Sequence, residues 1–386
     1  MYPVKKLQDC ATIIAGQSPE SKYYNTVGDG IPFFQGKADF GELYPSARVY
    51  CTNPTKIAQY NDILLSVRAP VGPTNLSPGK VCIGRGLAAI RPDSSLNLKY
   101  LLYYFRYFES QLSSKGTGTT FKAITQKTIK NLDVPVPPME EQVKIVARID
   151  ELFSELDKAI DTLKTTKEQL AVYRQVILVD AFKEALGSPY FEIEQMCDKI
   201  VDCPHSTPKW TEYGELCLRT TNFKRGYLDL QVPNYVSKEA FDERNRRITP
   251  SPGDVLYSRE GSILGIACII PEGINPCLGQ RMMLLRTKDT LNNRYLMHYL
   301  NSPTVTNHVI ATKGGTGSPH INVGDIKEFQ IPIPSLEEQS NIVRQIEEQL
   351  SSCDNVEKTV DAILTQADAM RQSILKQAFE GKKDVY

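Results

Sequence analysis

The sequence has no run of about 18 apolar residues, the length at which an apolar segment becomes a candidate to cross a membrane. Its first residues, MYPVKKLQDC, lack the apolar core of a secretory signal peptide. The nine cysteines are scattered singly, an odd number without the spacing of a disulfide framework. We therefore expect reduced thiols and a cytoplasmic protein.

The motifs of cofactor binding and catalysis are also missing. The sequence contains no GxGxxG that follows a strand and opens a helix, no GxxxxGK phosphate loop, and neither GxSxG nor HExxH. No Pro-Pro pair stands between Asp, Asn or Ser and an aromatic residue, the pattern of amino-methyltransferases. Cys197, Cys203 and His205 have a spacing that fits no structural zinc pattern. We expect no catalytic residue, bound cofactor or metal ion in this chain.

Net charge is zero, with 45 basic and 45 acidic side chains, but the charge is unevenly distributed. Residues 1–137 carry 16 basic and 9 acidic side chains, a net charge of +7. Residues 138–186 carry −3, residues 187–334 are neutral, and residues 335–386 carry −4. A basic part is typical of proteins that bind polyanions, although many basic domains bind none.

One long stretch without Gly or Pro follows Pro137 and Pro138 and continues almost to Gly187. Proline is tolerated in the first turn of a helix, and glycine is a common stop signal. Apolar side chains recur at alternating spacings of four and three, which predicts a coiled-coil seam rather than the broad face of a surface helix. The predicted seam consists of Ile145, Ile149, Leu152, Leu156, Ala159, Leu163, Leu170, Tyr173 and Ile177.

A second copy of this stretch lies 197 residues further along the chain, where IPIPSLEEQ at Ile331 repeats VPVPPMEEQ at Val134. Ser335 and Glu338 have the spacing of a capping box at the start of the second helix. An apolar seam needs a partner, and the other copy is present at the highest effective concentration. We expect the two helices to pack on each other. The second predicted seam consists of Ile342, Ile346, Cys353, Val356, Val360, Ile363, Ala367, Met370 and Ile374.

A strand-rich part precedes each helix. Short β-branched and aromatic runs between Gly, Pro and Asn clusters predict strands in residues 1–133, with one helix at 97–112. Residues 188–330 repeat this order, so that DILLSVRAPVG at Asp62 corresponds to DVLYSREGSILG at Asp254. The sequence therefore predicts an α+β protein in which a module of about 190 residues, a globular domain followed by a long helix, occurs twice.

Basic and amide side chains recur at related positions of the two halves. Lys37 and Asn222 follow one pair of matched strands, and Arg68 and Arg259 follow another. Arg and Asn are the side chains that read guanine and adenine edges through two hydrogen bonds. For any single one of these residues an ordinary surface contact, such as a salt bridge of an arginine, is the favoured alternative. The candidate DNA contacts are Lys37, Arg68, Arg85, Lys115, Lys122, Arg219, Asn222, Arg259, Arg281 and Lys313.

Two further features leave alternatives open. The glycine-rich loops KGTGTTFKAI at Lys115 and KGGTGSPHIN at Lys313 are either phosphate-binding loops or plain turns. The run RNRR at Arg244–Arg247 is either a phosphate contact of the second half alone or an ordinary solvated loop.

VPVPPMEEQ at Val134 and IPIPSLEEQ at Ile331, each opening a long helix and each preceded by a GTG loop, resemble the repeated signature of the specificity (S) subunits of Type I restriction-modification systems. The resemblance covers essentially the whole chain. In that family two spacer helices pack antiparallel with pseudo-two-fold symmetry. Each globular domain, a target recognition domain, reads one half of a split DNA site.

The resemblance implies four segments. Target recognition domains are expected at residues 1–137 and 188–334, and conserved spacer helices at residues 138–187 and 335–386. The neutral second domain leaves two possibilities. Either its basic side chains gather on one face, or partner subunits supply much of the phosphate contact.

The resemblance also implies a division of labour. Two modification (M) subunits bring S-adenosylmethionine and methylate adenine N6, and restriction (R) subunits add ATP-driven translocation and cleavage. This chain, as a non-catalytic subunit, is expected to bind double-stranded DNA at a bipartite asymmetric site and to direct both activities there. The acidic helices and the adjoining domain surfaces are expected to bind the M subunits.

Two other classes of protein remain open. A methyltransferase or endonuclease with an unrecognised active site would bind S-adenosylmethionine as an isolated chain. A coiled-coil scaffold whose globular ends bind proteins would not retard genomic DNA fragments in a gel. For a specificity subunit, we expect half-sites about one helical turn, on the order of 10 base pairs, apart, each with an adenine that can be extruded.

Overall fold

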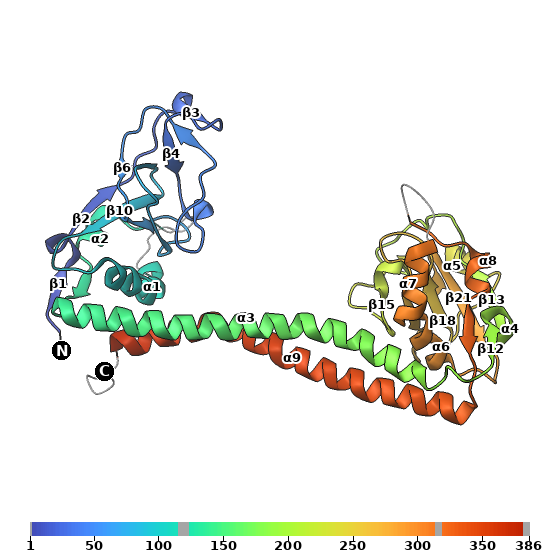
Figure 1. Cartoon of the computed structure of the whole chain (residues 1–386). Helices are drawn as coiled ribbons and strands as arrows, with labels where there is room; N and C mark the ends of the chain where they lie inside the picture. The colour runs from blue at the N-terminus through green and yellow to red at the C-terminus, as the bar shows by residue number, and fades with distance from the viewer. Residues whose placement is uncertain (1, 115–122, 313–318, 381–386) are drawn as a thin grey trace. The chain divides into compact units, whose positions relative to one another are not determined.

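The computed structural model describes residues 2–114, 123–312 and 319–380, which form two compact units (Figure 1). Unit 1 comprises residues 1–163 and 362–386, and unit 2 comprises residues 164–361. Two helices of 45 residues each, α3 (Met139–Lys183) and α9 (Leu336–Glu380), contribute to both units. Each unit therefore contains one strand-rich domain and parts of both long helices.

Unit 1 is built from short strands and two shorter helices. Its strands are β1 (Val4–Lys6), β2 (Ala11–Ala15), β3 (Tyr24–Asn25), β4 (Ile31–Phe34), β5 (Tyr50–Cys51), β6 (Ile57–Ala58), β7 (Ile63–Ser66), β8 (Thr74–Leu76), β9 (Val81–Ile83), β10 (Leu87–Pro92) and β11 (Asp133–Pro135). Its helices are α1 (Leu98–Ser114), which the sequence predicts, and α2 (Gln126–Lys130). Three 3-10 turns, η1 (Leu7–Asp9), η2 (Ser21–Tyr23) and η3 (Lys37–Asp39), connect them.

Unit 2 has a similar set of elements. Its strands are β12 (Tyr190–Glu192), β13 (Cys197–Asp202), β14 (Glu215–Leu218), β15 (Phe223–Lys224), β16 (Tyr227–Leu228), β17 (Tyr235–Val236), β18 (Val255–Ser258), β19 (Ala267–Ile269), β20 (Cys277–Leu278), β21 (Met282–Thr287) and β22 (Gln330–Pro332). Its helices are α4 (Ile193–Met196), α5 (Lys238–Arg244), α6 (Asn293–Leu300), α7 (Pro303–Thr312) and α8 (Val323–Lys327), with a 3-10 turn η4 (Thr220–Asn222).

The sequence repeat is a repeat of sheet topology. The antiparallel sheet β2-β10-β7-β8 of unit 1 has the same order as β13-β21-β18-β19 of unit 2. In each unit a parallel pair adjoins it, β4 with β9 and β14 with β20. A buried carboxylate recurs as well: Arg91 donates to Asp62 at 2.7 and 2.8 Å, and Arg286 donates to Asp254 at 2.8 and 2.7 Å. The two halves therefore share one scaffold.

A buried glutamine fixes the start of α3 to the domain that precedes it. The side-chain oxygen of Gln142 accepts a hydrogen bond from the backbone N–H of Asn97 at 2.7 Å. Its amide nitrogen donates to the carbonyls of Ser95 and Pro137, each at 2.8 Å. These three bonds give partners to the N–H of Asn97 and to the carbonyls of Ser95 and Pro137, which would otherwise be buried without a hydrogen bond.

Gln339 of α9 repeats this arrangement in unit 2. It accepts from the N–H of Asn292 at 2.8 Å and donates to the carbonyls of Thr290 at 3.1 Å and Pro334 at 2.9 Å. The repeated Glu-Glu-Gln signature therefore has a structural role, because its glutamine couples each long helix to its domain. The predicted capping box of the second helix is confirmed, since Glu338 accepts from the N–H of Ser335 and donates its own N–H to the Ser335 hydroxyl.

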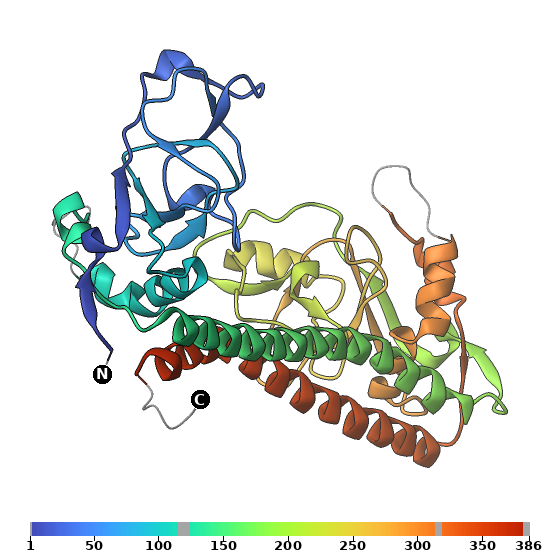
Figure 2. The same ribbon diagram turned by 60° about the vertical axis from the view of Figure 1, so that its left-hand side comes forward.

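The two long helices pack on each other within each unit, as Figures 1 and 2 show. In unit 1, Ile149 of α3 and Leu375 of α9 belong to one core. In unit 2, Ile177 of α3 shares a core with Ile346 of α9. The helices run antiparallel there, because Lys167 contacts Asp361 at 2.8 Å while Arg174, later in α3, contacts Asp354, earlier in α9, at 2.7 Å.

Some residues of the predicted seam are buried in the structure, and others are exposed. Val356, Ile363 and Met370 are predicted seam residues, but their side chains are 44, 41 and 46% exposed. Ala159 and Tyr173 of α3, also predicted seam residues, are likewise exposed. Buried members of the predicted seam are Ile145, Ile149, Leu156, Ile177, Ile342, Ile346, Cys353 and Val360, and partly buried members are Leu152, Leu163, Leu170, Ala367 and Ile374.

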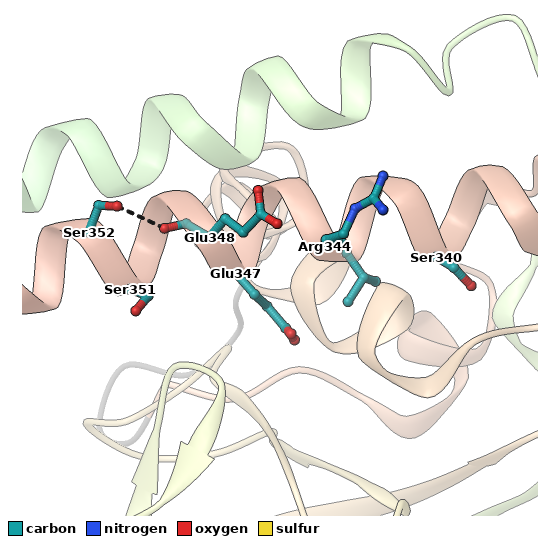
Figure 3. A pocket seen from close by; sticks show the side chains of 7 residues that line it. Ser340, Arg344, Glu347, Glu348, Ser351 and Ser352 are labelled. Atoms are coloured by element: carbon teal, nitrogen blue, oxygen red, sulfur yellow. Dashed lines mark hydrogen bonds between the residues drawn. The ribbon is translucent and has the colours of Figure 1, made fainter.

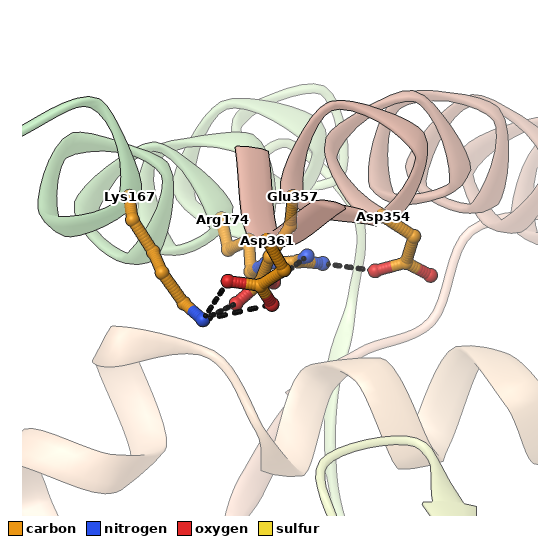
Figure 4. A network of polar contacts seen from close by, with 5 residues as sticks. All are labelled: Lys167, Arg174, Asp354, Glu357 and Asp361. Carbon is orange, nitrogen blue, oxygen red and sulfur yellow. Dashed lines mark hydrogen bonds and ion pairs between the residues drawn. The ribbon is translucent and has the colours of Figure 1, made fainter. Parts of the chain in front are cut away.

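Charged side chains occupy the flank of the seam that was expected to be apolar. Lys167 and Arg174 of α3 lie against Glu357 of α9, at 3.5 and 2.9 Å (Figure 4). Their aliphatic stems can cover the seam while the charged ends pair at its edge. On both sides of the predicted row, α3 carries side chains with enough aliphatic surface to pack against α9. The spacing of apolar residues alone therefore does not determine which side of the helix faces its partner.

We predict that Ile149→Asp and Ile346→Asp each lower the free energy of unfolding by several kcal/mol, because both side chains are fully buried and would leave an unpaired charge in the core. Val356→Asp is the matched control and should change stability by less than about 0.5 kcal/mol, since this side chain faces solvent. Urea unfolding followed by circular dichroism measures all three. Equal losses for Ile346→Asp and Val356→Asp would contradict the observed register.

Candidate nucleic-acid interface

Three cations that the sequence singles out meet at one cavity of unit 1. Lys37 begins η3 just after β4, Arg68 follows β7, and Arg85 lies in the turn between β9 and β10. All three line a cavity of about 500 Å³, together with Gln35 and Asp39 among other residues. The three positions are 17 or more residues apart in sequence, so only the fold brings them together.

Glycines allow the turns around this cavity to approach closely. A Cβ atom on Gly86 would lie 2.1 Å from the carbonyl oxygen of Gln35, and one on Gly84 would lie 3.3 Å from its Cα. The parallel pairing of β4 with β9 brings these two turns side by side. The glycines on either side of Arg85 therefore position it beside the turn that carries Lys37.

The cavity of unit 1 has an excess of positive charge. Asp39 lines it, but its carboxylate accepts from the Arg48 guanidinium at 2.8 Å and from the N–H of Gln35 at 2.8 Å. The side chains of Lys37, Arg68 and Arg85 are exposed and form no hydrogen bond or ion pair with another described residue. They are available to an anionic or hydrogen-bond-accepting ligand.

In unit 2, two of the candidate contacts serve the fold. Arg259 is buried and donates to both carboxylate oxygens of Asp202, at 2.8 and 3.0 Å. Asn222 is buried, accepts from the N–H of Arg219 at 2.9 Å and donates to the carbonyl of Asp229 at 3.0 Å. It corresponds in the structure to Asp39, which caps the end of β4 in the same way, and not to Lys37 as the sequence predicts.

The other two candidates of unit 2 are exposed. The Arg219 guanidinium lies 5.0 Å from the ring centroid of Trp210. Arg281 adopts a φ of 69°, which is unusual for a residue other than glycine, and its Nε lies 3.8 Å from a carboxylate oxygen of Glu260. Strained positions of this kind concentrate at functional sites. Lys115, Lys122 and Lys313 lie outside the described residues.

The basic run of unit 2 divides between structure and surface. Arg244 is buried and donates to the carbonyls of Leu278, Gly279 and Ser206. Arg246 and Arg247 are exposed. At most two of the three arginines therefore remain for contact with a phosphate.

A polar hollow of about 600 Å³ lies along α9 in unit 2, lined by serines and charged residues of one helix (Figure 3). Glu347 in its lining contacts Arg294 at 2.6 Å and His298 at 3.4 Å, both on α6. These contacts, first the hydrogen bond to His298, lower the pKa of Glu347. Asp150 of α3 contacts Lys99 of α1 in the corresponding position of unit 1, so these carboxylates hold each helix to its domain.

An apolar surface on α3 was not predicted as a site. Val172, Tyr173 and Val176 are 65, 51 and 42% exposed and line, with Leu170, a hollow of about 610 Å³ in unit 2. We call these three residues the α3 apolar surface. The sequence carries a signal for this surface, because Tyr173 completes an apolar heptad row, but the heptad spacing predicts that this row lies in the seam.

Among the described residues, no group of His, Cys, Asp or Glu side chains is arranged to hold a metal ion. All nine cysteines are buried as free thiols. No helix in the described part of the chain combines the length and apolar character that a membrane crossing requires.

A family model described as "Type I restriction modification DNA specificity domain" matches residues 2–170 and 191–366. The chain is 42% identical over 167 residues to the "Putative type I restriction enzyme MjaX specificity subunit" of Methanocaldococcus jannaschii, covering 43% of this chain and 38% of the relative. It is 23% identical over 317 residues to the "Type I restriction enzyme EcoBI specificity subunit" of Escherichia coli, covering 75% and 66%. The chain thus spans between about a third and two thirds of the length of these two relatives.

A solved structure concerned with complex assembly and conformational transition of the type I R-M system contains a chain with the same fold. It matches 98% of this chain and 98% of its own length, with a TM-score of 0.68 and 20% identity.

We predict that Arg259→Ala lowers the free energy of unfolding by about 3 kcal/mol, because the mostly buried Asp202 loses both hydrogen bonds from the guanidinium and keeps only its contact with His205. Arg247→Ala, on an exposed arginine of the same unit, should change it by less than about 0.5 kcal/mol. Urea unfolding distinguishes the two. If both substitutions change the free energy of unfolding only slightly, Arg259 is not required for stability and again becomes a candidate for DNA contact.

Proposed function

The chain belongs to the family of Type I restriction-modification DNA specificity domains, and from this we propose that it is the subunit that reads DNA sequence for a restriction-modification complex. It binds a bipartite, asymmetric site in double-stranded DNA. It directs adenine-N6 methylation and restriction, which partner subunits carry out. The chain contributes recognition and not catalysis.

One observation carries this proposal: a cavity with three cations that pair with no other described residue, on a scaffold that occurs twice with different exposed side chains. Lys37, Arg68 and Arg85 supply hydrogen-bond donors and positive charge in unit 1. Unit 2 has the same strand order, but equivalent backbone bonds place Glu260 and Gln280 where unit 1 has Arg68 and Arg85. A shared scaffold with different contact residues is suited to two unlike half-sites.

The partners proposed for this chain supply the chemistry. Modification subunits, two for each chain, bring S-adenosylmethionine, and restriction subunits bring ATP hydrolysis and cleavage. The chain itself binds no cofactor, and the complex acts in the cytoplasm, where the DNA is. An adenine in each half-site has to leave the base stack to reach the methyl donor.

The α3 apolar surface is the proposed docking site for a modification subunit. Three apolar side chains on one face of a helix, beside a hollow, are suited to receive apolar side chains of another protein. The charged side chains Lys167 and Arg174 pair with carboxylates of α9 at the edge of the helix contact. The apolar row thereby remains available to a partner.

A coiled-coil scaffold whose ends bind proteins is the main alternative. It would not need unpaired cations around a cavity, and it would not retard DNA. A gel-shift with genomic fragments, performed with and without the modification subunit, separates the two functions.

We predict that replacing residues 1–133 with the equivalent domain of a relative changes one half-site of the methylated motif and leaves the other half-site intact, because each domain reads its half independently. Sequencing of DNA from cells that carry each chimera measures the motif. Exchange of residues 188–330 is the matched control and should change the other half-site. A continuous motif, or a swap that alters both halves, would contradict the proposal.

We predict that Tyr173→Glu reduces co-purification of the modification subunit by at least about tenfold, because a charge is placed in the centre of an apolar contact. Val232→Glu is the control, since Val232 is an exposed valine of the same unit outside this surface. Both variants should keep the melting temperature of the parent chain. Unchanged co-purification of Tyr173→Glu would move the docking site elsewhere.

A further inference from the structure

We propose that Arg68 and Glu260 are matched base-reading residues of the two units, with opposite hydrogen-bonding character. Arg68 reads a guanine in the half-site of unit 1, and Glu260 reads a cytosine in the half-site of unit 2. This assignment rests on the proposed function and specifies which side chains make the two half-sites differ.

Backbone hydrogen bonds show that the two residues occupy the same place in the fold. Arg68 forms an isolated antiparallel bridge with Ala123, and Glu260 forms one with His320. Beside each bridge, the isoleucine that follows Ala123 or His320 donates its N–H to the carbonyl of the residue that precedes Arg68 or Glu260. Ile124 donates to Val67 and Ile321 to Arg259, each at 3.0 Å.

Each residue lies just after an equivalent inner strand of its four-stranded sheet, β7 in unit 1 and β18 in unit 2. Arg68 stands two residues after β7 and Glu260 two residues after β18. These strands pair in the same order with β10 and β21, so the backbone that aims the two side chains is equivalent. Differences in what the side chains can bind therefore arise from the side chains themselves.

Both side chains are accessible. The Arg68 side chain is exposed, lines the cavity of unit 1 and makes no hydrogen bond or ion pair with another described residue. The Glu260 side chain retains about a third of its exposure, and Arg281 lies 3.8 Å from its carboxylate, too far for a strong hydrogen bond. By contrast, the arginine next to Glu260, Arg259, is held by Asp202.

The chemistry of the two side chains selects different bases. A guanidinium offers two parallel donors, which match the O6 and N7 acceptors of guanine in the major groove. An ionised carboxylate only accepts. Cytosine N4 and adenine N6 are the major-groove donors, but adenine places its N7 acceptor beside N6, where a carboxylate has no donor to offer, so a carboxylate favours cytosine. A position occupied by a donor in one unit and an acceptor in the other thus predicts guanine in one half-site and cytosine in the other.

The neighbours of the two residues follow the same division. Lys37 and Arg85 flank Arg68 as two further exposed cations, suited to adjacent phosphates. In unit 2, Gln280 stands in place of Arg85, and Thr207 donates to its side-chain oxygen at 3.0 Å. At this pair of positions, unit 1 therefore offers a cation to phosphate and unit 2 offers a neutral amide.

The test uses the full chain with its modification subunits in cells, and the motif is read by sequencing methylated adenines. Arg68→Gln should reduce discrimination for guanine at one position of one half-site by about 10- to 100-fold, with the other half-site unchanged. Glu260→Gln should relax cytosine at one position of the other half-site by a similar factor, with adenine gaining, because glutamine pairs with adenine. Both side chains are accessible, so the melting temperature should stay within a few degrees of the parent value.

Arg85→Gln is the matched control. It should weaken binding about equally for all sequences and reduce the dependence of log affinity on log salt by roughly one, as expected for one lost phosphate contact. If Arg68→Gln behaves like Arg85→Gln, Arg68 contacts a phosphate and the assignment is wrong. A parent motif that both variants leave unchanged also overturns it, whereas a parent complex that methylates no defined motif overturns the proposed function, and the assignment with it.

Discussion

The hydrogen bonds of one buried glutamine in each unit are the constraint on which the rest of the structure depends. Gln142 and Gln339 each join the first turn of a long helix to the backbone of the domain before it, through one accepted and two donated hydrogen bonds. Without these bonds, several backbone groups would be buried without partners, at about 1–3 kcal/mol each. The first turn of each long helix is consequently fixed to the domain that precedes it.

Charged side chains lie at the contact between the two long helices, while some apolar side chains lie on their exposed surface. Lys167, Arg174 and Glu357 line the edge of the contact between the helices, and the apolar Tyr173 and Val356 face solvent. For an isolated chain this arrangement leaves apolar surface in water, at a cost of about 25 cal/mol for each Å². It is advantageous for a subunit whose helices are covered in a complex.

The repeat separates what the two units share from what distinguishes them. They share strand order, the pairing of a buried aspartate with an arginine, and the contacts of a buried glutamine. They differ at exposed positions after equivalent strands, as Arg68 and Glu260 illustrate. A stable interior with variable loop residues allows the recognised sequence to change without a change of fold.

The sequence by itself determined the module of about 190 residues, the two long helices and the candidate cations, because period, repeat offset and residue type are local properties of the chain. Only the tertiary structure decided which candidates are available. Arg259 pairs with Asp202, 57 residues away, and Asn222 forms hydrogen bonds within a loop, so both serve the fold. Lys37, Arg68 and Arg85 line one cavity. It also decided which flank of the heptad row meets the partner helix, because packing of distant segments and not spacing sets the rotation of a helix about its axis.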